Sequence, residues 1–112
     1  MDYKELNEIL VEYAEVEKEK IQNATIKTGE ISIMRLRNVL IINGKILEEY
    51  LEKNLYIATV NGGLAKMSKA WVVAELDKDC VKLAVHAKEG LIKQNISQGV
   101  IKLLADALQK EM

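Results

Sequence analysis

The chain of 112 residues contains no proline and no phenylalanine, and only one tryptophan, one cysteine and one histidine. A single cysteine excludes an intramolecular disulfide and indicates a reducing compartment, so we expect a cytoplasmic protein. One Cys and one His are too few for a zinc site, so we expect no metal and no cofactor. Apolar runs such as residues 39–42 are far shorter than the roughly 20 residues that span a membrane.

The same scarcity argues against an enzyme. Cys80 and His86 are six residues apart on one expected strand, which separates them by about 20 Å and prevents a thiolate–imidazole pair within one chain. A lone histidine also leaves no credible Ser-His-Asp arrangement. We therefore predict no catalytic residues, although an enzyme stays among the alternatives.

Charge is nearly balanced but unevenly distributed. The net charge is −1, which argues against a protein that holds nucleic acid through its phosphates. Residues 1–24 contain seven acidic side chains and three lysines, so the rest of the chain is net positive. This positive part keeps a nucleic-acid binder as one of the alternatives.

Side-chain periodicity predicts a single α+β domain, residues 1–112. The predicted helices cover residues 2–24, 45–54 and 91–111, and the clearest strands cover 55–60, 70–76 and 80–88. Residues 24–42 are interpreted as two further strands, although residues 31–41 also keep helical spacing. We expect a mainly antiparallel sheet of about five strands with two long flanking helices, in the order α-ββ-α-βββ-α.

Strands 70–76 and 80–88 form the clearest hairpin, and its register can be predicted. We expect residues whose numbers sum to 157 to face each other across the two strands. One face of the hairpin then consists of apolar pairs and is expected in the core. The other face then pairs Glu75 with Lys82, which is favourable across strands. That outer face also presents four candidates for a partner surface: Trp71, Val73, Ala84 and His86. Either a helix of the same chain covers this half-apolar face, or it binds a second copy or another protein.

The stretch VNGGLAKMSKAW, residues 60–71, contains the residue types of a phosphate-binding loop. A P-loop would read GxxxxGK[ST] and lead into a helix, whereas this stretch leads into an expected strand. Asn61-Gly62 between apolar runs predicts a hairpin turn instead. A loop that contacts an anionic ligand remains the second interpretation, with these candidates: Asn61, Gly62, Gly63, Lys66, Ser68 and Lys69.

Arg35 and Arg37 are the only arginines, and on a strand they would share a face. Arginine binds phosphate and carboxylate groups in a bidentate manner, so both are added to the candidate ligand-binding residues, beside the alternative of a solvated strand face. The preferred hypothesis is a small non-catalytic protein-interaction module that self-associates through its apolar sheet face. The main alternative is a binding module for a nucleotide or sugar phosphate.

Overall fold

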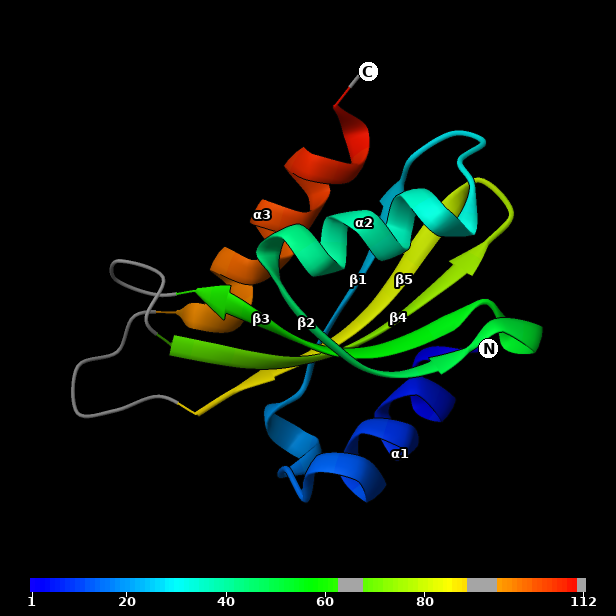
Figure 1. Cartoon of the computed structure of the whole chain (residues 1–112). Coiled ribbons are helices and arrows are strands. Elements are labelled where there is room, and N and C mark those ends of the chain that lie inside the picture. Colours follow the sequence, from blue (N-terminus) through cyan, green and yellow to red (C-terminus); the bar gives the residue numbers. More distant parts are fainter. Residues whose placement is uncertain (63–67, 89–94, 111–112) are drawn as a thin grey trace.

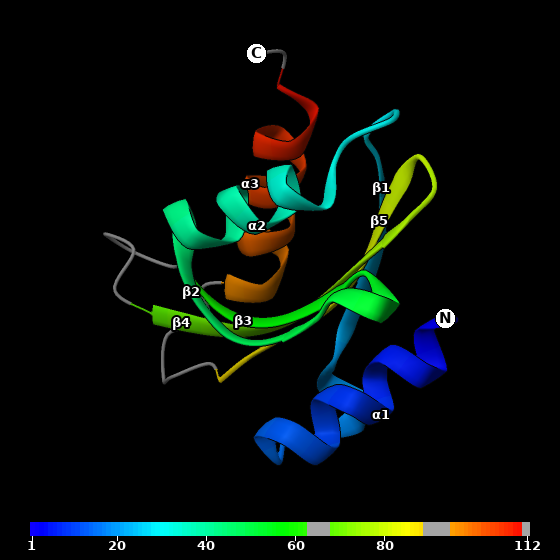
Figure 2. The same ribbon diagram turned by 45° about the vertical axis from the view of Figure 1, so that its right-hand side comes forward.

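An antiparallel sheet of five strands runs through the middle of the protein, with helices on both faces (Figures 1 and 2). The computed structural model describes residues 1–62, 68–88 and 95–110. Helix α1 (Tyr3–Ala14) lies on one face of the sheet, and helices α2 (Ile33–Asn43) and α3 (Ile96–Gln109) lie on the other. The predicted α+β class with a five-stranded antiparallel sheet and long flanking helices is confirmed.

The strands follow the spatial order β1-β5-β4-β3-β2, and every neighbouring pair is antiparallel. Their bounds are β1 (Gln22–Lys27), β2 (Gly44–Tyr50), β3 (Leu55–Gly62), β4 (Ser68–Asp77) and β5 (Cys80–Ala87). The predicted hairpin register is confirmed, because Glu75 faces Lys82 and Trp71 faces His86 across β4 and β5. Strands β1 and β2 therefore form the two edges of the sheet.

The second predicted strand and the middle predicted helix exchange places. Residues 33–43 form helix α2, so the strand interpretation of this segment is wrong and the helical alternative is correct. The Ser32 side chain caps the helix by accepting a hydrogen bond from the Arg35 amide, and Leu36, Val39 and Leu40 face the core. The buried residues of this segment therefore follow helical spacing, and the local alternation of side-chain types does not determine its structure.

Residues 44–50 form strand β2, so the helix predicted over 45–54 is also wrong. Strand β2 pairs with β3 along one side of its backbone. The 3-10 turn η2 (Leu51–Lys53) follows the strand. Because β2 is an edge strand, several of its charged side chains remain exposed. An exposed edge strand of mixed apolar and charged residues resembles a surface helix in composition, and this explains the error.

Helix α1 is shorter than the predicted helix over residues 2–24. Asp2 caps its N-terminus in a reciprocal arrangement with Glu5, and Glu15 ends it in a left-handed conformation with φ 54°. The chain then forms the 3-10 turn η1 (Lys18–Lys20) before it enters β1. This early end turns the chain back, so that β1 can pair with β5.

Two hydrophobic clusters hold the layers together. The larger one fills the space between the sheet and helices α2 and α3, and includes Tyr56, Leu83 and Leu104. The smaller one lies between α1 and the opposite face, where Leu6 and Leu10 are completely buried. Both faces of the central strands are therefore covered within one chain.

Candidate functional site

The outer face of the β4–β5 hairpin is covered by α1. Val73 and Ala84 are completely buried in the cluster that includes Leu6 and Leu10 of this helix. The alternative in which a helix of the same chain covers this face is therefore the arrangement in the structure. Val73 and Ala84 are not accessible to a partner while α1 stays in place.

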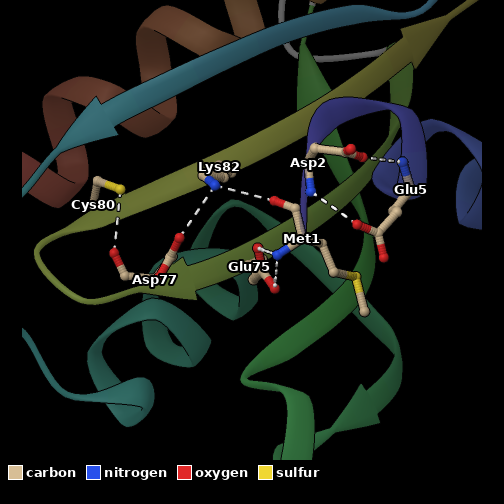
Figure 3. Close-up of polar contacts among 7 residues, drawn as sticks. All are labelled: Met1, Asp2, Glu5, Glu75, Asp77, Cys80 and Lys82. Atoms are coloured by element: carbon tan, nitrogen blue, oxygen red, sulfur yellow. Dashed lines mark hydrogen bonds and ion pairs between the residues drawn. The ribbon is translucent and has the colours of Figure 1, made fainter.

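Polar contacts clamp the start of α1 to the same hairpin (Figure 3). The Met1 ammonium group donates to both carboxylate oxygens of Glu75, at 3.1 and 3.2 Å, and Glu75 is only 6% exposed. The Lys82 ammonium group donates to the Met1 carbonyl at 3.0 Å and lies 3.1 Å from the Asp77 carboxylate. Lys82 thus faces Glu75 in the register, but the ion-pair partner of Glu75 is Met1.

The Lys82–Asp77 contact also shifts the protonation of both groups. The hydrogen bond from Lys82 lowers the pKa of Asp77, and the same bond raises the pKa of Lys82. Both shifts favour the charged forms, so this end of the hairpin stays ion-paired at neutral pH. The clamp serves the packing of α1, and it leaves no free charge aimed at a ligand among the residues in Figure 3.

Trp71 and His86 lie beyond the end of α1, where they line a groove of about 810 Å³. The two residues face each other across β4 and β5, and the Tyr13 ring packs edge-on against Trp71 with centroids 6.2 Å apart. Burial lowers the pKa of His86, Glu17 opposes this effect and Lys20 adds to it. Among the described residues, the charged lining of the groove consists of three lysines and three glutamates: Lys20, Lys69, Lys88, Glu15, Glu17 and Glu19.

Asn61 and Gly62 belong to strand β3 and do not form the turn itself, so that part of the hairpin prediction is wrong. The ladder with β4 continues through both residues. Gly62 is needed for packing, because an added Cβ atom would lie 2.8 Å from Cγ2 of Val100 in α3. The predicted connection between two strands is confirmed, since β3 and β4 are antiparallel neighbours. Gly63 lies outside the described residues.

Of the remaining loop candidates, only Lys69 is shown to line the groove beside Trp71 and His86. Ser68 begins β4 and pairs with Gly62. Lys66 lies outside the described residues. The structure therefore brings one lysine of the predicted ligand loop together with two residues of the predicted partner surface.

Arg35 and Arg37 lie on helix α2 and are engaged within the chain. The Arg35 guanidinium group donates to carbonyl oxygens at the C-terminal end of α3, including that of Leu108 at 3.3 Å. This contact compensates the negative end of the helix dipole. Arg37 Nε donates to the Glu49 carboxylate of β2 at 2.6 Å. Neither arginine lines the groove that contains Lys69.

Exposed hydrophobic residues gather around the edge strand β2. Ile42, just before the strand, is 80% exposed, and Leu51, just after it, is 57% exposed. Met34 and Ile41 add to the exposed surface of α2. We call the surface formed by α2 and β2, with Ile41, Ile42 and Leu51, the edge surface.

Sequence reasoning missed the edge surface because it placed residues 39–42 in a strand. Once residues 33–43 are read as a helix, the spacing of Leu36, Val39 and Leu40 defines the buried stripe. Ile41 and Ile42 then fall outside that stripe, so helical spacing would have predicted that both are exposed, as they are in the structure.

Within the described part of the chain, no group of three or more His, Cys, Asp or Glu side chains is placed to hold a metal ion. No helix in these residues is long and apolar enough to cross a membrane. Comparisons with protein-family models, curated proteins and solved structures returned no significant match. Function must therefore be inferred from the geometry of the chain alone.

Proposed function

We propose that this protein is a non-catalytic protein-interaction module that self-associates as a homodimer. The observation that carries the proposal is the position of the exposed hydrophobic residues at both ends of an edge strand. Exposed apolar residues at both ends of an unpaired strand support a contact with a partner along that edge. The apolar sheet face favoured by the sequence is occupied by α1, so the edge surface takes its place.

A second copy fits the edge surface because strand β2 has opposite charges toward its two ends. Lys45 lies near its start and Glu48 near its end. In a two-fold symmetric contact, each residue of one copy meets the complementary region of the other. One strand therefore supplies both halves of a complementary pair.

The proposal is tested by the molar mass of the purified chain in solution over a range of concentrations. We expect a concentration-dependent dimer for the wild type. Ile42→Lys should raise the dimer dissociation constant by at least about tenfold, because it places a charge in an apolar contact. Tyr3→Lys is the control on α1; because the Tyr3 hydroxyl contacts Thr25 of β1, circular dichroism first establishes that this variant is folded. A wild type that stays monomeric at every concentration would contradict the proposal.

A binding module for an anionic small molecule is the second candidate, favoured by Lys69 lining the groove with Trp71 and His86. An aromatic ring beside a lysine suits a nucleotide or a sugar phosphate. The glutamates of the same groove oppose an anion, and for this reason we rank it second.

The second candidate predicts that a panel of nucleotides and sugar phosphates raises the melting temperature. Lys69→Ala should remove the shift, whereas Lys27→Ala, an exposed lysine on β1, should preserve it. No shift across the panel would contradict this candidate and leave the dimer proposal unaffected.

A further inference from the structure

The two edges of the sheet differ in how they are covered. At the β1 edge, polar side chains bond to both flanking helices, as in the contacts of Asn23 with Asn7 and of Gln22 with Gln98. At the β2 edge, the strand pairs with β3 and packs against α2, and Tyr50 at its end packs in the cluster beneath α1. No strand of the described sheet pairs with the backbone of β2 that faces away from β3, so this is an unpaired edge, as is the outer side of β1.

A bulge in β2 determines which of its side chains share a face. The register with β3 shifts between Ile46 and Glu48, so Leu47 is the inserted residue. Lys45 pairs with Thr59 and Glu48 pairs with Ile57, and these partners lie two apart on β3. Lys45 and Glu48 therefore project from the same face of the sheet, the face covered by α1.

We propose that β2 pairs antiparallel with β2 of a second copy about a two-fold axis between Ile46 and Leu47, forming a continuous sheet across the dimer. In this register Lys45 of each copy faces the second copy's Glu48, so two cross-strand ion pairs form. The proposal rests on the proposed function and names the partner and its alignment. The two bulges then face each other at the axis.

The exposed hydrophobic residues support antiparallel pairing at this edge, and the charges of β2 define its register. In an antiparallel pair, the start of one strand lies beside the end of the other. Ile42 lies at the end of helix α2 and Leu51 begins η2, so the two residues flank opposite ends of β2, and antiparallel pairing brings the Ile42 end of one copy beside the Leu51 end of the other. The dimer would thus cover the two most exposed large hydrophobic residues of the described chain.

Other registers lose these matches. A shift by one residue opposes Lys45 to Glu49, but Glu49 pairs with Tyr56 and projects from the face of α2, so the charges do not meet. Shifts toward the C-terminal end bring Glu48 next to the second copy's Glu48 or Glu49, and like charges in facing positions are destabilising. The acidic residues of β2 therefore oppose incorrect pairing as well as supporting one alignment.

The test uses complementary charge reversals and the molar mass in solution. Lys45→Glu alone and Glu48→Lys alone should each raise the dimer dissociation constant by at least about tenfold, because each opposes like charges twice. An equimolar mixture of the two variants should restore a dimer, since each copy then supplies the charge that the other lacks. Lys27→Glu on the β1 edge is the matched control and should keep the wild-type mass.

The outcomes separate this register from the underlying proposal. Restoration of the dimer only in the mixture supports the register. Single variants that dimerise as well as the wild type would overturn the register, and the self-association proposal would stand if Ile42→Lys still dissociates the dimer. A mixture that fails to dimerise would also overturn the register, provided that circular dichroism shows both variants folded. A monomeric wild type would overturn both proposals.

Discussion

Gly44, at the junction of α2 and β2, allows the sharpest prediction about stability. Helix and strand join here without a loop, and the backbone of β2 passes very close to β3. A Cβ atom at Gly44 would overlap the Thr59 carbonyl group, with its carbon at 2.8 Å, and would lie 2.8 Å from Cα of Val60. All of these are backbone atoms of a buried strand, so a side-chain rotation cannot relieve the overlap.

The expected magnitude follows from this geometry. Gly44 has a φ of −179°, which any residue can adopt, so the cost of Gly44→Ala is steric. Overpacking of a side chain in a core costs typically about 1–3 kcal/mol, and here the strand pairing itself must move. We therefore expect the free energy of unfolding to fall by more than about 3 kcal/mol.

Urea unfolding at a fixed protein concentration, followed by circular dichroism and by the fluorescence of Trp71, measures this loss. Two glycines serve as controls because an added Cβ meets nothing within 4 Å at either. Gly99→Ala, inside α3, should stabilise by about 0.5–1 kcal/mol. Gly29→Ala should destabilise by about 1 kcal/mol, since Gly29 has a φ of 71°. A Gly44→Ala variant within about 1 kcal/mol of the wild type would refute the reasoning.

Two further predictions concern α1 and the groove. Leu10→Ala should lower the free energy of unfolding by about 2–5 kcal/mol, because Leu10 is completely buried between α1 and the sheet; a loss below about 1 kcal/mol would show that α1 contributes little to the fold. His86 has a lowered pKa, so the unfolded chain binds its proton first as the pH falls, and the wild type should lose stability below about pH 6.5. His86→Gln removes the contribution of His86 to the pH dependence of stability. Between about pH 7.5 and pH 5.5, urea unfolding should therefore show a smaller loss of unfolding free energy for the variant than for the wild type. Equal losses would contradict the lowered pKa of His86.

Sequence reasoning succeeded where neighbouring residues constrain each other in pairs. The β4–β5 register could be derived because Glu75 opposite Lys82 and apolar residues on the other face leave one consistent alignment. That α1 covers Val73 and Ala84 could not be derived, because the outer face of a sheet is apolar both under a helix and in an interface. Likewise, the contact of Arg35 with the end of α3 depends on tertiary packing across more than 70 positions.

The misassigned segment is also the segment that carries the proposed interface, because both depend on the position of β2 at an edge of the sheet. Residues 41–51 combine exposed apolar side chains with exposed charged side chains, as an edge strand does, and the proposed dimer would bury part of this surface. Within one chain the residues KILEEY resemble an amphipathic helix, since Lys45, Glu48 and Glu49 suggest a solvated face. In the dimer Lys45 and Glu48 would bond across the two-fold axis, while Glu49 stays with Arg37. A local pattern that suits both a surface helix and an edge strand is thus assigned only by tertiary pairing, here with β3 and, in the proposed dimer, with β2 of a second copy.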